Sequence, residues 1–135
     1  MRILVWLLLC TFVFADDIYI TSPQEDDVYC IGSTLPIIYH VRGSGMANIG
    51  RANATLVSDD PPIVLDIPGS ESSGEHGVDH LVRWTLPASL SNGPYSLRVA
   101  GLATYRCSKN RDGQAPYESC QITLEKSVSL TIINC

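Results

Sequence analysis

The sequence predicts an all-β protein, a β-sandwich of about seven strands held by two disulfides. After the first fifteen residues, no segment repeats apolar residues with a sustained helical period. Short runs rich in Ile, Val, Leu, Thr and Tyr recur instead, and Gly, Pro, Asn, Asp and Ser separate them. Four cysteines remain beyond the N-terminal segment, an even number that is typical of small disulfide-bonded domains.

The first fifteen residues predict a secretory signal peptide. Arg2 precedes an apolar run, and Val13 and Ala15 stand before Asp16 as at a signal-peptidase site. The run is too short to span a bilayer comfortably, which disfavours the alternative of an N-terminal membrane anchor. We therefore expect a secreted, extracellular protein with one domain, residues 16–135, and no stable membrane anchor after cleavage.

Seven runs predict strands, and turn signals separate them at regular intervals. This spacing is typical of an immunoglobulin-like or fibronectin-III-like sandwich with Greek-key connections. Pro36, near the start of the second run, predicts an edge position or a bulge there. The runs cover residues 17–22, 33–42, 53–58, 63–68, 80–86, 95–102 and 127–134.

The stretch RWTLPASLSNGPYSLRV carries the strongest pattern. Val82, Trp84 and Leu86 share one strand face, so we expect Trp84 at the centre of the core rather than exposed as a sugar-stacking platform. The segment PASLSNGP is too long for a two-residue hairpin, which favours a crossover between sheets with Leu90 closing the end of the core. Tyr95 follows it and predicts a tyrosine corner, whose hydroxyl bonds the loop backbone.

The topology suggests how the cysteines pair. Cys10 belongs to the signal peptide, and the remaining four are expected to form two disulfides. Cys107 and Cys120 lie in one long insertion, residues 103–126, and are expected to pair there. In an immunoglobulin-like sandwich Cys30 and Cys135 end at the same pole, so they form the second expected disulfide.

Composition and motifs argue against several function classes. Beyond residue 15 the chain has eight Lys and Arg against fourteen Asp and Glu, which disfavours nucleic acid and anionic lipid as partners. No G-x-S-x-G motif is present, no free cysteine is expected, and most carboxylates stand in adjacent pairs at turns and termini. We predict that the protein is not an enzyme and has no catalytic residues.

Glu75, His76, Asp79 and His80 form the best candidate metal cluster. Two imidazoles and two carboxylates suit a divalent metal. However, histidines four residues apart make a site on a helix, whereas His80 begins a predicted strand after a Gly-rich loop. We therefore expect a solvated polar loop, and no metal or cofactor.

Two other features concern the surface. The insertion 103–126 mixes cations and aromatics on an otherwise acidic chain, as a binding loop does. The alternative is an ordinary solvated loop held by its disulfide. Asn53-Ala54-Thr55 is an N-glycosylation sequon, so Asn53 is predicted to carry a glycan. The candidate binding residues of the insertion are Tyr105, Arg106, Lys109, Arg111 and Tyr117.

Three stretches of the sequence are similar to a known family: IYITSP, VYCIGSTLPIIYHV and VRWTLPASLSNGPYSLRV. They resemble the N-terminal domain of the Kre/Knh-like yeast cell-wall synthesis proteins. This domain is also found in Ser/Thr-rich GPI-anchored fungal proteins. The resemblance covers about residues 17–134. It implies an extracellular fungal β-sandwich that is associated with the cell wall. The implied role is the assembly or binding of β-glucan, and the implied partner is a wall polysaccharide. The family pattern includes a Ser/Thr-rich stalk, a Lys-rich second half or a GPI tail, which this sequence lacks, and the cysteine-bearing insertion departs from it.

The alternative is a small secreted interaction protein that acts on a surface protein of the cell or of a host. Its small size, paired cysteines and lack of an anchor favour it. A metal- or glycan-active enzyme is the least favoured interpretation, because it depends on the cluster at residues 75–80.

Overall fold

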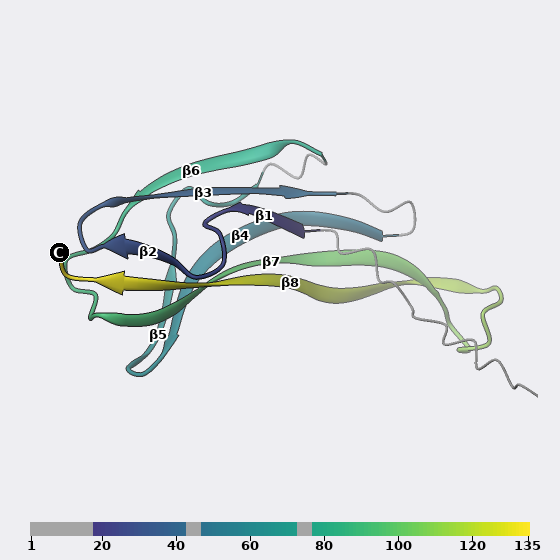
Figure 1. Cartoon of the computed structure of the whole chain (residues 1–135). Helices are drawn as coiled ribbons and strands as arrows, with labels where there is room; N and C mark the ends of the chain where they lie inside the picture. The colour runs from purple at the N-terminus through teal and green to yellow at the C-terminus, as the bar shows by residue number, and fades with distance from the viewer. Residues whose placement is uncertain (1–17, 43–46, 73–76) are drawn as a thin grey trace, which may run out of the picture.

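The computed structural model describes residues 18–42, 47–72 and 77–135, which form eight strands and no helix (Figure 1). Within these residues there is accordingly no helix of the length and apolar character that crossing a membrane requires. The strands are β1 (Ile18–Ser22), β2 (Asp27–Cys30), β3 (Thr34–Val41), β4 (Ala47–Asp59), β5 (Pro62–Asp66), β6 (Asp79–Thr85), β7 (Gly93–Ser108) and β8 (Tyr117–Ile133).

The strands form two sheets that lie face to face (Figure 1). One has the order β1-β3-β6, and the other has the order β2-β8-β7-β4-β5. All pairs are antiparallel except β2 and β8, which run parallel. The expected all-β architecture is confirmed, but the described residues form eight strands rather than seven.

The additional strand is β2. It has only four residues, too few to show an alternating pattern, and its partner in β8 lies about a hundred residues away, at Leu130–Ile133. A contact so distant in sequence leaves no local signal, and the predicted strands therefore omitted it.

The core lies between the two sheets, where alternate residues of each strand face inward. In β3 these are Leu35, Ile37, Tyr39 and Val41, each at most 2% exposed. From the opposite sheet, Leu56, Leu97, Val99, Leu130 and Ile132 meet them. Burial of each such side chain contributes about 1.5 to 3 kcal/mol relative to its exposure.

The expected crossover after β6 is confirmed. The chain leaves the three-stranded sheet at Thr85 and enters the five-stranded sheet at Gly93. Leu90, 7% exposed, belongs to the core, and the Tyr95 hydroxyl donates a hydrogen bond to the Ser91 carbonyl at 2.7 Å. The tyrosine corner therefore ties the crossover to the start of β7.

The position expected for Trp84 is wrong in part. Its side chain faces inward and packs against the core, but it is only partly buried. The reason is that β6 is an edge strand of the three-stranded sheet. Tyr39, on the middle strand β3, is instead the largest fully buried side chain.

Pro36 lies at a local edge, as its missing N–H requires. Although β3 is the middle strand, the last residue of β1, Ser22, pairs with Ile38 after a register irregularity. Of the two described strands beside β3, only β6 therefore pairs with it at Pro36. The Ser22 hydroxyl donates to the Pro36 carbonyl at 2.7 Å and closes the end of β1.

The two disulfides pair as expected. Cys30–Cys135 joins the end of β2 to the residue that follows β8, across 105 positions of sequence. Cys107–Cys120 joins β7 to β8, across 13 positions. Two disulfides are compatible with a secreted protein.

Candidate functional site

The β7–β8 hairpin extends beyond the ends of the other strands (Figure 1). The pairing between β7 and β8 continues without a register shift from Gly93–Ile132 to Ser108–Tyr117. The expected insertion at residues 103–126 is therefore mostly strand, and only residues 109–116 form a loop, here called the hairpin tip. Both faces of this segment are largely solvated, so apolar alternation could not indicate its strands.

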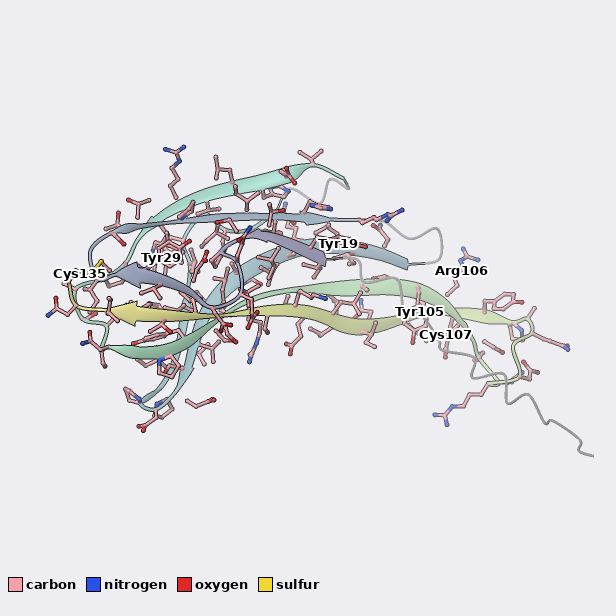
Figure 2. The ribbon with its side chains drawn as sticks, viewed as in Figure 1. Tyr19, Tyr29, Tyr105, Arg106, Cys107 and Cys135 are labelled. Atoms are coloured by element: carbon pink, nitrogen blue, oxygen red, sulfur yellow. A yellow bond between two sulfur atoms is a disulfide. The ribbon has the colours of Figure 1, made fainter. Side chains whose placement is uncertain are left out.

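The structure separates the five candidate binding residues. Tyr105 and Arg106 point to opposite faces of β7 (Figure 2), and Tyr105 is half-buried whereas Arg106 is exposed. Tyr117, 54% exposed, pairs with Ser108 and so shares the face of Arg106. Lys109 and Arg111 are exposed in the adjoining tip. Four of the five residues thus lie on the outer face or at the tip, and Tyr105 does not.

An irregularity in β4 packs closely against Gly101 of β7. The pairing of β4 with β7 shifts between Ile49 and Ala52, opposite this glycine. A Cβ atom at Gly101 would lie 2.8 Å from Ile49 Cγ2 and 3.2 Å from Ala52 Cβ. Only glycine fits this close approach, so β4 holds the inner half of the hairpin tightly against the core.

Hydrogen bonds order the hairpin tip. The Ser108 hydroxyl lies 2.7 Å from Asp112 Oδ1 and 2.7 Å from the Gln114 carbonyl, and the Gln114 N–H donates to Asp112 Oδ1 at 2.9 Å. The Lys109 N–H donates to the Pro116 carbonyl at 2.9 Å. Arg111 adopts a positive φ of 57°, which completes the turn. A loop ordered in this way loses less entropy when it binds a partner.

The Asp112 carboxylate gives the tip a pH dependence. Hydrogen bonds from the Ser108 hydroxyl and then from the Gln114 N–H hold the pKa of Asp112 below its ordinary value of 3.8. The order that Asp112 confers on the tip is therefore complete above pH 3.8 and is lost as the pH falls through its lower folded-state pKa. We expect Ser108→Ala to raise the pKa of Asp112 in an NMR titration, while Ser119→Ala leaves it unchanged.

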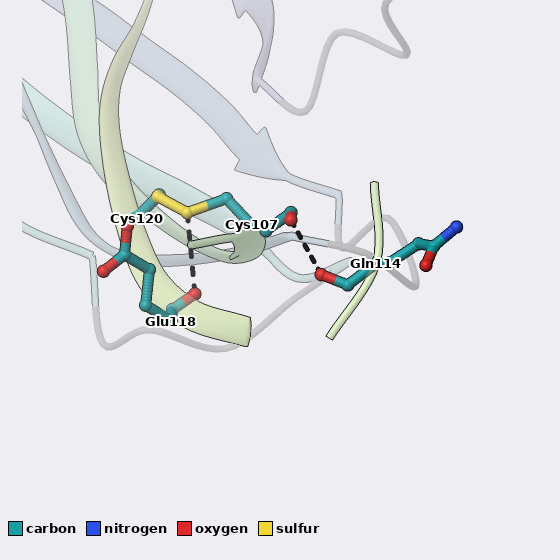
Figure 3. Close-up of a disulfide and its surroundings, with 5 residues drawn as sticks. Cys107, Gln114, Glu118 and Cys120 are labelled. Atoms are coloured by element: carbon teal, nitrogen blue, oxygen red, sulfur yellow. Dashed lines mark hydrogen bonds between the residues drawn. A yellow bond between two sulfur atoms is a disulfide. The ribbon is translucent and has the colours of Figure 1, made fainter. Parts of the chain in front are cut away.

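The tip disulfide has a carboxylate beside it. Ligand atoms of Cys107, Glu118 and Cys120 lie within 4.8 Å of one another (Figure 3). Both sulfur atoms are bonded in the disulfide, however, and a metal requires thiolates. This cluster therefore braces the hairpin and does not hold a metal in the oxidised protein.

The predicted cluster at residues 75–80 is only partly described, since Glu75 and His76 lie outside the described residues. Asp79 and His80 point to opposite faces of β6. His80 faces Tyr39, with ring centroids 5.5 Å apart, whereas Asp79 Oδ1 lies 3.3 Å from Nδ1 of His40 on the outer face. The structure does not bring Asp79 and His80 together.

Three side chains, those of Tyr19, His40 and Asp79, form a row on the outer face of the three-stranded sheet, which the sequence did not reveal. Tyr19 stacks on His40 at 4.9 Å, and His40 meets Asp79. Each residue lies on a different strand, so only the register of β1, β3 and β6 aligns them.

Asn53 lies exposed on β4, as its predicted glycosylation requires. Beside it is a cavity of about 360 Å³ whose charged lining comes from Arg51, Asp66 and Glu71. Arg51 and Glu71 form an ion pair at 3.5 Å across its rim.

Comparison of the chain with protein-family models, with curated proteins and with solved structures finds no match.

Proposed function

We propose that this protein is a non-catalytic binding module that contacts a protein partner through the tip of the β7–β8 hairpin. The observation that carries the proposal is the group of exposed cations Arg106, Lys109 and Arg111 on an ordered, protruding hairpin. Among the described residues, no ion pair joins these cations to a carboxylate. They are therefore available to a partner.

The chemistry of the tip favours an acidic protein surface. The chain as a whole has a net charge of −5, whereas residues 105–118 carry three cations against two carboxylates, Asp112 and Glu118, so this segment is a local exception. Arg and Tyr are the residue types that contribute most to protein interfaces, and Tyr117 shares the face of Arg106. A complementary acidic patch would be attracted over about a Debye length, roughly 8 Å at physiological salt.

A wall polysaccharide is the second candidate ligand. The resemblance to the Kre/Knh-like proteins favours it, and one observation adds to it. Ser119, Gln121 and Thr123 form an exposed row on the outer face of β8. Hydroxyl and amide groups in such a row suit hydrogen bonding to sugar hydroxyls. This candidate corresponds to a secreted module of the fungal cell wall, in β-glucan assembly or binding.

We also infer that the sandwich is of the immunoglobulin or fibronectin type III kind. The sheet switch between β6 and β7, followed by a tyrosine corner at the start of β7, supports this topology. In such folds, loops and hairpins on a rigid sandwich carry the binding residues.

Retention on isolated fungal cell walls tests the proposal. We expect the wild-type protein to be retained, and protease treatment of the walls to abolish retention. Replacement of Arg106, Lys109 and Arg111 by serine should weaken retention about tenfold or more, because Arg side chains dominate such interfaces. Arg83→Ser, on the exposed face of β6, serves as the control and should bind as wild type.

Loss of retention after β-1,6-glucanase rather than protease treatment would favour the polysaccharide instead. Full retention of the triple variant would contradict the role of the hairpin tip, and no retention of the wild type would contradict a partner in the cell wall.

A further inference from the structure

Among the described residues, no strand lies beside the outer edge of β8 over most of its length. β7 pairs with β8 from Tyr117 to Ile132, whereas β2 pairs only with Leu130–Ile133. At Ser129 the segment before β2 still covers the edge. The Asp26 N–H donates to the Ser129 carbonyl at 2.8 Å, and the Ser129 N–H lies 3.3 Å from both carboxylate oxygens of Glu25. Within the part of the chain that the structure describes, nothing pairs with this edge from residue 117 to residue 128.

The hydrogen bonds of Ser129 identify which backbone groups of β8 point away from β7. Its N–H and carbonyl point away from β7, and residues of a strand alternate in this respect. Because the β7–β8 register has no shift, every second residue before Ser129 also points outward. A row of unpaired N–H and carbonyl groups of this kind is a template for another strand. These six residues, here called the open edge, are Tyr117, Ser119, Gln121, Thr123, Glu125 and Ser127.

The open edge is self-complementary about its midpoint, Ile122. In an antiparallel pair related by a two-fold axis through Ile122, this side chain, 50% exposed, meets its own copy. On the same face, Glu118 lies opposite Lys126 of the second copy, and the reverse pair forms on the other side of the axis. Gln121 and Thr123 then form a hydrogen-bonded pair, and all six outward residues of each copy find partners.

We propose that two copies of this chain associate through the open edge of β8, which joins their five-stranded sheets into one continuous sheet. Charged residues on an edge strand usually prevent such pairing, but here their signs and positions select one register. A shift of two residues places Glu118 opposite Leu124 or Val128 instead. The pairing is limited to this length at both ends. At Ser129 the edge is covered by Glu25 and Asp26, and before Tyr117 the strand ends at the hairpin tip.

The open edge shares Tyr117 with the binding face proposed above, and Ser119, Gln121 and Thr123 with the row proposed for sugar, but the three cations that carry the protein-binding proposal lie outside it. Arg106 lies on β7 and Lys109 and Arg111 lie at the tip, so none of them belongs to the paired edge. The dimer would present two hairpin tips, one at each end of the paired strands.

Charge reversal tests the proposal on the full chain with both disulfides formed. We expect sedimentation velocity to show a concentration-dependent dimer. Glu118→Lys and Lys126→Glu should each weaken dimerisation about tenfold or more, since each places two like-charged pairs across the axis. An equimolar mixture of the two variants should form a heterodimer, and the double variant should dimerise as wild type, because both restore opposite charges.

Two further variants separate the edge from general charge effects. Asp60→Lys, in the turn after β4, changes the net charge by the same amount as Glu118→Lys and should dimerise as wild type. Thr123→Pro removes an outward N–H at the centre of the edge and should abolish the dimer, with circular dichroism to verify its fold. A wild-type monomer at concentrations up to about 1 mM, or a dimer that the charge reversals do not change, would overturn the proposal.

Discussion

Replacing both Cys30 and Cys135 by serine is expected to lower the free energy of unfolding by about 4 to 5 kcal/mol. The disulfide closes a loop across 105 positions of sequence, nearly the whole described chain, so its removal releases much conformational entropy in the unfolded state. It also frees the short strand β2, which among the described residues pairs with the end of β8 alone. Urea unfolding followed by circular dichroism measures the effect.

The second disulfide is the matched control. Cys107–Cys120 spans only 13 positions, and the loop-length dependence predicts that its removal costs about 2 kcal/mol less than removal of Cys30–Cys135. The double variant Cys107→Ser with Cys120→Ser should therefore retain a cooperative transition at higher urea. Equal losses for the two disulfides would show that loop closure does not govern their contribution.

Replacing Tyr39 by phenylalanine should destabilise the protein by about 1 to 3 kcal/mol, although no packing volume is lost. The Tyr39 hydroxyl contacts the Ala52 carbonyl at 3.1 Å and also the Ser70 carbonyl, and the side chain is fully buried. The hydroxyl has a single proton, which these two carbonyls share, so the substitution removes one buried hydrogen bond, and the Ala52 carbonyl still accepts from the Ser72 N–H at 2.7 Å. Tyr95→Phe, which removes a single hydrogen bond at the less buried crossover, should cost less.

Alkaline pH provides a second measurement on Tyr39. Burial raises the pKa of Tyr39 above its ordinary value of 10.0. Its contribution to stability is therefore present below pH 10 and is lost as the pH rises through the folded-state pKa. We expect wild type to lose stability more steeply than Tyr39→Phe above pH 10, and parallel losses would contradict this assignment.

The candidate site was predictable only in composition. The cations and tyrosines of residues 103–126 are visible in the sequence, but whether they share a face depends on strand register. Register placed Tyr105 on one face and Arg106 with Tyr117 on the other. The same limit applies to the cluster at residues 75–80, because Asp79 and His80 are adjacent in sequence and a strand turns adjacent side chains to opposite faces.

Local patterns by themselves determined the all-β class, most of the strands and the crossover with its tyrosine corner, whereas the pairing of Cys30 with Cys135 followed from the expected sandwich topology. These features depend on alternation and on turn residues, which act over a few positions of sequence. Only the tertiary structure decided that Tyr39 rather than Trp84 occupies the centre, that β2 exists, and that the edge of β8 is open. Each of these depends on which strand lies beside which, and that is set by contacts between residues far apart in the chain.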